Sequence, residues 1–166
     1  MSAPLGVVSD THDDLKRARA AVDRFADAGC ETVVHCGDVI APFTAAVFDT
    51  DAFDFHAVRG NNDGEWNLQN AIDAFGTYHG ETAELTVGGR DVAVYHGTSE
   101  TLVDALVRCG DYDYVLHGHT HERGHDEVAG THRINPGGLP FPAGDDRFHV
   151  ALVDPAAGDV EFVDLD

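Results

Sequence analysis

The chain has 166 residues, 43% of them hydrophobic, and its 30 acidic and 10 basic side chains give a formal net charge of −20. This composition is typical of one folded domain and excludes a disordered chain. No apolar run approaches the roughly 18 residues of a membrane-spanning helix, and the few Lys and Arg residues argue against a surface that binds duplex nucleic acid.

The first part of the chain alternates short apolar runs with helical patterns. Three runs that each end in Asp are typical of buried strands leading into functional loops, and they cover residues 4–10, 31–38 and 53–63. Between the first two runs apolar residues recur at helical spacing, with Asp13 as the expected N-cap and Gly29 as the C-terminal stop. Two further short helices are expected at Pro42–Phe48 and Leu68–Phe75.

The second part of the chain is richer in hairpins. Two apolar runs meet across Gly88–Gly89, and the C-terminal stretch repeats the pattern across Pro155–Asp159, as antiparallel strand pairs do. A helix is expected at Glu100–Arg108, because its apolar residues share one face, and another strand-like run covers residues 112–121. The order of elements predicts an α/β domain with mixed sheet, in which two sheets pack face to face between helices.

Polar side chains stand where five of the apolar runs end. In chain order they are Asp10 and His12, Asp38, Asn61, His96, and then His119 and His121. Because ligands of α/β sheets bind outside the carboxyl ends of the strands, we expect these side chains to converge on one crevice. Residues i and i+2 of an extended chain point the same way, so Asp10 and His12 should hold one ion together. His119 and His121 should do the same, or straddle two ions.

The seven candidates supply four imidazoles, two carboxylates and one carboxamide, with no thiolate. Seven ligands are too many for one tetrahedral ion, whereas a bridging carboxylate would give each of two ions four protein ligands. This nitrogen and oxygen set favours two divalent ions, with Mn²⁺ expected and Fe, Ni, Co or Zn as alternatives. Two such ions about 3.5–4 Å apart would hold a hydroxide between them and clamp a phosphoryl group for in-line attack.

The ordered blocks D-T-H, G-D, G-N-N-D, Y-H-G and G-H-T-H resemble those of the calcineurin-like metallophosphoesterases, over residues 5 to about 140. The short chain and the I-N-P-G-G block at 134–138 look most like the small prokaryotic phosphodiesterases, a branch that includes the retromer scaffold subunit. The resemblance implies one domain over residues 1–166, folded as a four-layer αββα sandwich of two mixed sheets flanked by helices. It implies one ion held by Asp10, His12, Asp38 and His121. A second would be held by Asp38, Asn61, His96 and His119, with Asp38 bridging.

Two departures from the family pattern bear on function. Many relatives have a leaving-group histidine where this chain has Asn62, and an uncharged amide cannot donate a proton as an acid. Catalysis, for which Asn62 and the bridging Asp38 are the candidate residues, should therefore rely on the metals and favour leaving groups that depart without help. The block GDVIAPF lacks the Asp-Arg pair of protein phosphatases and dinucleoside-tetraphosphate hydrolases, which argues against both activities. The sequence therefore predicts a dinuclear phosphodiesterase that hydrolyses a small phosphoester with a metal-bridging hydroxide. A phosphomonoesterase or nuclease of the same superfamily, or a non-catalytic retromer-like scaffold, are the alternatives.

Other polar residues of the blocks receive supporting roles. Asn62 and His125 are candidate substrate contacts, with His125 expected on a loop. His35 could orient a ligand from behind or simply pack in the core. Asp63 is expected to brace its loop through backbone hydrogen bonds, and His117 to pack within its strand because it alternates away from His119.

The surface and compartment are also constrained by composition. The excess charge comes from 22 Asp and 8 Glu against nine Arg and a single Lys. A surface of this kind is typical of a halophile, because at molar salt the Debye length is about 3 Å and self-repulsion is screened; an ordinary acidic protein is the alternative. Three Cys residues without C-x-x-C spacing and the absence of a signal-peptide pattern favour the cytoplasm. Self-association is left open.

Overall fold

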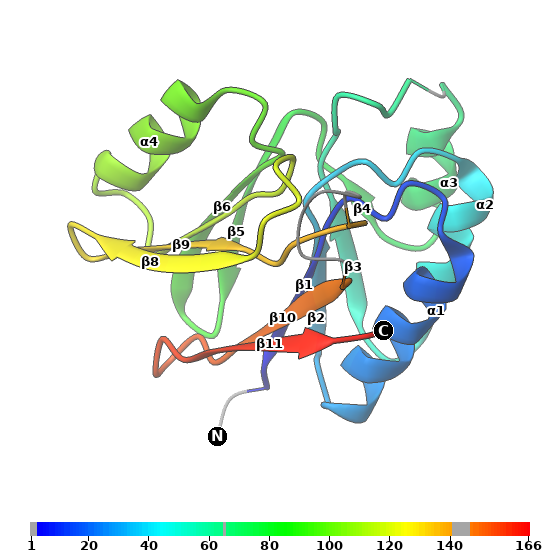
Figure 1. Cartoon of the computed structure of the whole chain (residues 1–166), viewed down its shortest axis with the longest axis horizontal. Coiled ribbons are helices and arrows are strands. Elements are labelled where there is room, and N and C mark those ends of the chain that lie inside the picture. Colours follow the sequence, from blue (N-terminus) through cyan, green and yellow to red (C-terminus); the bar gives the residue numbers. More distant parts are fainter. Residues whose placement is uncertain (1–2, 65, 141–146) are drawn as a thin grey trace.

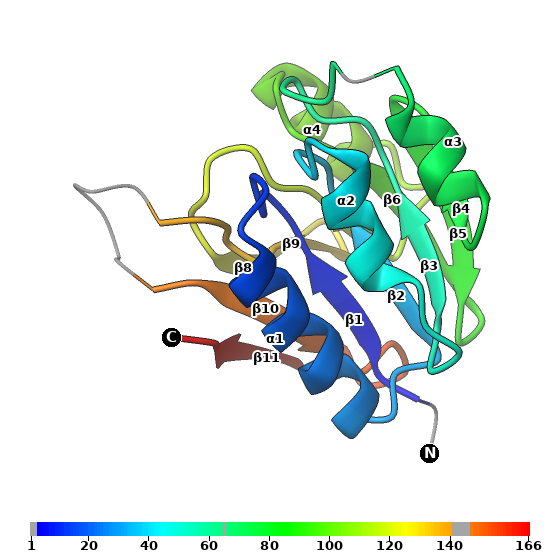
Figure 2. The ribbon, with the colours of Figure 1, turned by 90° about the vertical axis from the view of Figure 1, so that its right-hand side faces the viewer.

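The computed structural model describes residues 3–64, 66–140 and 147–166, and its strands form two facing sheets (Figures 1 and 2). The first has the strand order β11-β10-β1-β2-β3-β4, in which β1 to β4 run parallel to one another, and β10 runs antiparallel to both of its neighbours, β1 and β11. These strands are β1 (Leu5–Val8), β2 (Thr32–His35), β3 (Asp54–Ala57), β4 (Thr77–Tyr78), β10 (His149–Val153) and β11 (Val160–Asp164).

The second sheet is also mixed, with the strand order β5-β6-β7-β9-β8. Its β5–β6 and β8–β9 pairs are antiparallel, whereas β7 runs parallel to both β6 and β9. The strands are β5 (Thr82–Val87), β6 (Arg90–Tyr95), β7 (Tyr114–Leu116), β8 (Gly124–Val128) and β9 (Thr131–Asn135). The two hairpins expected across Gly88–Gly89 and across Pro155–Asp159 are therefore confirmed, as β5–β6 and β10–β11.

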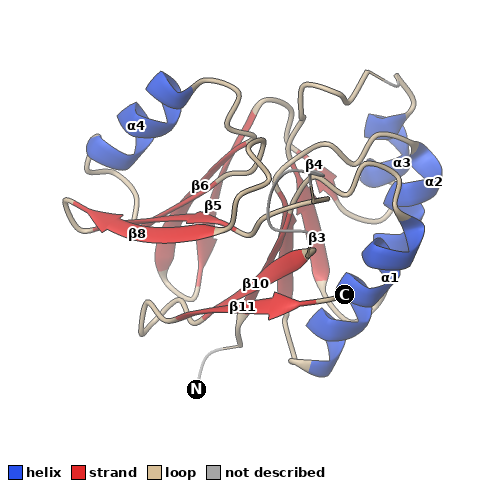
Figure 3. Ribbon diagram, in the orientation of Figure 1, coloured by secondary structure: helices blue, strands red, loops and turns tan. Residues whose placement is uncertain are grey.

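Helices cover the outer faces of the two sheets (Figure 3). The first sheet carries α1 (Leu15–Asp27), α2 (Pro42–Ala45), a 3₁₀ turn (Ala46–Phe48) and α3 (Leu68–Asp73). The second sheet carries α4 (Glu100–Arg108). This arrangement of helix, sheet, sheet and helix layers confirms the fold class expected from the sequence.

Three apolar clusters fill the spaces between these layers. Strand β1 contributes to two of them because its side chains alternate between faces: Leu5 and Val7 are buried between the sheets, and Val8 lies on the helix side. Gly6 makes room for Phe25 of α1, since a Cβ at this position would stand 2.6 Å from the Phe25 ring. The close packing of α1 against β1 therefore depends on the absence of a side chain at Gly6.

One expected helix cap is wrong by one residue. Asp14, rather than Asp13, is the N-cap of α1, and its carboxylate accepts the backbone N–H of Arg17 at 3.0 Å. Asp13 instead accepts hydrogen bonds from the Ala41 backbone N–H (2.9 Å) and the Thr44 hydroxyl (2.6 Å). The side chain therefore ties the loop after β1 to α2, a long-range role that helical periodicity cannot reveal.

The sequence pattern does not predict β4, β8 or β9. Strand β8 reads Gly-His-Asp-Glu-Val and is exposed over all but its last residue, so it has no alternation of apolar and polar side chains to detect. Its formation depends on antiparallel pairing with β9, in which His125 lies opposite Ile134. His125, expected on a loop, therefore lies on a strand.

Candidate metal centre

Loops that follow β1, β2, β3, β6 and β7 bring the predicted ligands together. The Nε2 atom of His12 lies 3.6 Å from Asp10 Oδ1 and 3.2 Å from Asp38 Oδ2. His96 Nε2 lies 3.8 and 3.5 Å from the same two oxygens, and His121 Nε2 lies 3.3 Å from Asp10 Oδ1. Residues separated by up to 111 positions in the chain thus face one small volume, as the strand-end argument requires.

Two overlapping groups in this volume have the geometry of a metal site. Asp10, His12 and His121 form one, and Asp10, Asp38 and His96 form the other; within each, one ligand atom per residue lies within 4.8 Å of the others. Asp10 belongs to both groups. The geometry therefore places two candidate ligand groups side by side, and together they contain five of the seven predicted ligands.

The hydrogen bonding of Asp10 leaves one oxygen for a cation. Its Oδ2 accepts from the Ser9 hydroxyl at 2.6 Å and from the His119 backbone N–H at 2.9 Å. Within the described residues, Asp10 Oδ1 and His12 Nε2 are buried without a hydrogen-bond partner. Such orphaned polar atoms are destabilising unless something binds them, and an oxygen beside imidazole nitrogens is a donor set that divalent transition metals accept. The residues fit a metal.

The remaining two candidates, Asn61 and His119, lie beside His96. The Asn61 Oδ1 atom lies 2.9 Å from His96 Nε2 and 3.1 Å from His119 Nδ1. His96 donates its Nδ1–H to the Cys36 carbonyl at 2.7 Å, which directs its other ring nitrogen toward the centre. All seven predicted ligands are therefore adjacent in space.

Charge pairing among these groups shifts their pKa values in opposite directions. Burial alone would raise the pKa of Asp10 and of Asp38, but contacts with His12 and with His121 or His96 outweigh it and hold both well below their usual range. The adjacent carboxylates of Asp10 and Asp38 raise the pKa of His12 to about 9, and the pKa of His96 is also raised, despite its burial, by Asp38 and Asp10. The carboxylates are thus ionised and ready to act as ligands, whereas a cation must displace a proton from His12 at neutral pH.

Five of the seven candidate ligands have a left-handed backbone. Their φ angles are +53° for Asp10, +44° for His12, +61° for Asp38, +72° for His119 and +62° for His121. The expectation that Asp10–His12 and His119–His121 lie on extended chain is therefore wrong, although the side chains still meet. Non-glycine residues in this region cost about 1–3 kcal/mol each and persist only where neighbouring structure fixes them.

Glycines that are not among the predicted site residues allow the loops to close around the carboxylates. A Cβ at Gly60 would stand 2.1 Å from Asp38 Oδ1, and one at Gly118 would stand 2.4 Å from Asp10 Oδ2. A Cβ at Gly138 would stand 2.5 Å from the Asp10 Cβ. The signal was present in the sequence, because each glycine belongs to one of the quoted blocks.

Two polar residues brace the ligand loops from behind. Asp63 accepts the backbone N–H groups of Asp38, Ile40 and Gly60, each at 2.8 Å, which confirms its expected role. Asn135 donates to the Gly118 carbonyl (3.2 Å) and the Thr120 hydroxyl (3.0 Å) and so supports the loop that carries His119 and His121.

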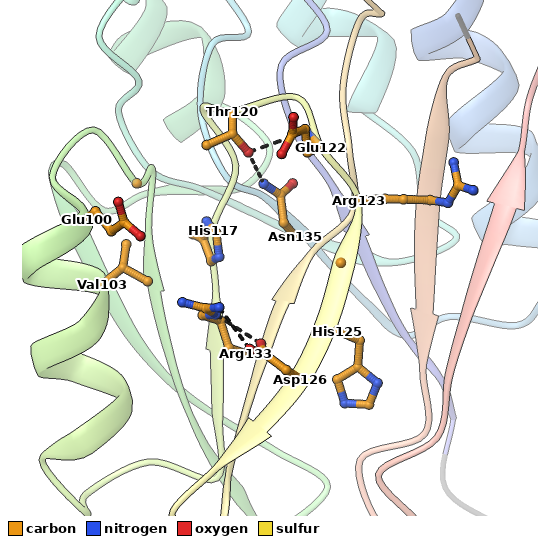
Figure 4. Close-up of a pocket in the computed structure, with 12 residues that line it drawn as sticks. Glu100, Val103, His117, Thr120, Glu122, Arg123, His125, Asp126, Arg133 and Asn135 are labelled. Carbon is orange, nitrogen blue, oxygen red and sulfur yellow. Dashed lines mark hydrogen bonds and ion pairs between the residues drawn. The ribbon is translucent and has the colours of Figure 1, made fainter. Parts of the chain in front are cut away.

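The two candidate substrate contacts lie in different places. Asn62 is exposed, and both its backbone N–H and its side-chain amide donate to Asp38 at 2.9 Å. His125 is paired with His132 at 2.9 Å and lines a pocket of about 590 Å³ beside α4, together with His117 (Figure 4). Thr120, which lies between two ligands, points into the same pocket (Figure 4). The structure brings Asn62, but not His125, to the carboxylates.

Comparison with known proteins identifies the family. The profile of the calcineurin-like phosphoesterase superfamily domain matches residues 4–158. The chain belongs to this superfamily. It is 36% identical over 143 residues to the phosphodiesterase MJ0936 of Methanocaldococcus jannaschii, covering 80% of this chain and 82% of the relative. It is 26% identical over 142 residues to the probable metallophosphoesterase YsnB of Bacillus subtilis, covering 82% and 75%.

Solved structures of the superfamily agree with this fold. A structure described as a novel archaeal phosphodiesterase superposes with a TM-score of 0.90 at 28% identity, covering 97% of this chain and 99% of that one. Vps29 of Entamoeba histolytica in complex with zinc superposes with a TM-score of 0.69 at 23% identity, covering 98% and 99%, which is a likeness of fold alone. Among the described residues of this family member, no helix is long and apolar enough to cross a bilayer.

Proposed function

We propose that residues 1–166 form one metallophosphoesterase domain with phosphodiesterase activity at a dinuclear centre. One ion is held by Asp10, His12, Asp38 and His121, and the other by Asp38, Asn61, His96 and His119. The observation that carries the proposal is the pair of orphaned buried atoms, Asp10 Oδ1 and His12 Nε2, at the meeting point of two ligand groups. The phosphodiesterase named among the relatives supports diesters as the substrate class.

The chain's own residues prepare this centre for phosphoryl chemistry. Divalent ions bound there would supply positive charge to polarise the phosphoryl oxygens and to lower the pKa of an attacking water. The Cys36 carbonyl holds His96 in the tautomer that presents Nε2 to the centre. Asn62 places an amide donor beside Asp38, where it can turn to a substrate oxygen, but a neutral amide cannot transfer a proton to a departing alkoxide.

The test is hydrolysis by protein that has been stripped with a chelator and then given Mn²⁺, the ion that we infer from the donor set. We expect bis(p-nitrophenyl) phosphate to be cleaved faster than p-nitrophenyl phosphate, since the reverse order would favour a phosphomonoesterase. Asp38→Asn should lose more than the roughly 10–100-fold typical of residues behind the ligands. The matched control is Asp111→Asn, an exposed aspartate, which should keep the parent rate. Full activity of Asp38→Asn would contradict the proposal.

We also infer a cytoplasmic protein adapted to high salt. The net charge of −20 and the single Lys support salt adaptation. The three free thiols, of which that of Cys109 is exposed, support a reducing compartment. The small phosphoester must then be recognised locally, since salt screens the distant surface carboxylates while the buried centre keeps its charge.

A further inference from the structure

One buried imidazole near the metal centre has no part in the scheme above. His35 is the last residue of β2 and is fully buried. Its ring stands edge-on to Phe48, with centroids 5.6 Å apart, and to Phe55, at 6.4 Å. A side chain of similar size without nitrogen atoms would fill this apolar space without the desolvation penalty of imidazole. The polar ring therefore requires an explanation beyond packing.

Both ring nitrogens of His35 are bonded to ligand loops. The backbone N–H of Gly37 lies 3.1 Å from Nδ1, and because an N–H can only donate, Nδ1 must be the unprotonated acceptor. The proton is then on Nε2, which donates to the Thr11 hydroxyl at 3.1 Å. Burial lowers the pKa of His35 to about 3, so the ring remains in this neutral form around neutral pH.

The two bonds reach into the strained parts of both loops. Thr11 lies between Asp10 and His12, which have left-handed φ angles of +53° and +44°. Gly37 directly precedes Asp38, whose φ is +61°. A bond at each point opposes relaxation of these segments toward ordinary backbone conformations.

The bond to Gly37 also acts on a third ligand. The Cys36–Gly37 peptide unit donates its N–H to His35 and accepts the Nδ1–H of His96 at its carbonyl oxygen. Rotation of this peptide would therefore disturb the hydrogen bond that orients His96.

We propose that His35 is a positioning residue of the metal centre. Its imidazole hydrogen-bonds the Thr11 hydroxyl and the Cys36–Gly37 peptide, and by holding both in place it sets the affinity of the centre for the cations. Two backbone bonds also join these loops, from Asp10 N to the Gly37 carbonyl and from His12 N to the Asp38 carbonyl. They fix the distance between the loops, whereas the His35 bonds fix the Thr11 side chain and the rotation of the peptide. The inference rests on the proposed metal centre.

The test compares Mn²⁺ affinity, by isothermal titration of chelator-stripped protein, with the free energy of urea unfolding. His35→Leu removes both bonds and should raise the Mn²⁺ dissociation constant by about 10–100-fold. Phe48→Leu is the matched control, because it removes packing against the same ring and touches neither loop bond. It should destabilise the fold and change the dissociation constant less than threefold.

Thr11 provides an independent pair of variants if His35→Leu does not fold. Thr11→Val keeps the shape of the side chain but removes the hydroxyl that accepts the hydrogen bond of His35, and should weaken Mn²⁺ binding about tenfold or more. Thr11→Ser keeps the hydroxyl and should bind Mn²⁺ with the parent affinity. Unchanged affinity in folded His35→Leu or in Thr11→Val would overturn the inference and leave His35 as a packing residue. If the parent protein binds no Mn²⁺, the proposed centre itself fails, which distinguishes the two outcomes.

Discussion

Replacing His35 by Leu should reduce the acid sensitivity of the fold. Burial lowers the pKa of His35 from 6.5 to about 3 in the folded protein, whereas the unfolded chain protonates the ring at its ordinary value. Since the pKa of this base is depressed by folding, the unfolded state binds more protons between pH 6.5 and pH 3. The free energy of unfolding must therefore decrease as the pH falls through this window.

The magnitude at pH 5 follows from the ordinary pKa of 6.5. Protonation of His35 stabilises the unfolded chain at pH 5 by RT ln(1 + 10^1.5), about 2 kcal/mol, and by only about 0.2 kcal/mol at pH 7. The folded state gains almost nothing, because pH 5 is well above the folded-state pKa. Between pH 7 and pH 5, the parent should thus lose about 2 kcal/mol more of its unfolding free energy than His35→Leu.

Urea unfolding at both pH values measures this difference directly. A chelator keeps metal binding, which has its own pH dependence, out of the comparison. Far-UV circular dichroism is the suitable signal, since Trp66 is 80% exposed and its fluorescence responds weakly to unfolding. Equal losses of stability in the parent and in His35→Leu would refute the claim that the buried ring is held neutral.

Three further predictions address the site and the surface. Gly60→Ala places a methyl group 2.1 Å from Asp38 Oδ1 and should weaken Mn²⁺ binding in a calorimetric titration. The control Gly64→Ala has open space around its Cβ and should keep the parent affinity. Equal affinities of the two variants would contradict the steric argument. Asn62→His should selectively speed the hydrolysis of diesters with poor leaving groups, as measured with a series of diesters whose leaving groups differ in pKa. An equal effect on all esters would exclude an acid role at this position. The melting temperature should rise between 0.2 and 3 M KCl, because salt screens the net charge of −20, and a constant value would argue against salt adaptation.

The sequence was a good guide wherever local pattern or chain order decided the structure. Glu100–Arg108 is a helix with the expected bounds, because its apolar face is continuous and Ser99 caps its start. The seven ligands meet because parallel strands place their carboxyl ends on one edge, a rule that needs only the order of strands. Neither inference required knowledge of contacts between distant side chains.

The conformation of the ligand loops depends on such distant contacts and could not be predicted. The backbone N–H of His119 donates to Asp10, 109 residues away, and the Asp38 N–H donates to Asp63. Bonds of this kind hold the chain in left-handed conformations that local propensity disfavours. The roles of Asp13 and His35 follow the same logic, because both side chains act on a neighbouring loop.

Which carboxylate bridges the two ions can be decided by metal stoichiometry. Asp10 belongs to both ligand groups, but its Oδ2 already accepts two hydrogen bonds, so only Oδ1 is available. Asp38 accepts one bond at each oxygen, both from Asn62, and keeps a lone pair on each for an ion. Asp10→Asn should therefore still bind one Mn²⁺ per chain, whereas Asp38→Asn should lose both, as measured by calorimetric titration. If instead Asp10→Asn lost both ions and Asp38→Asn kept one, Asp10 would be the bridge.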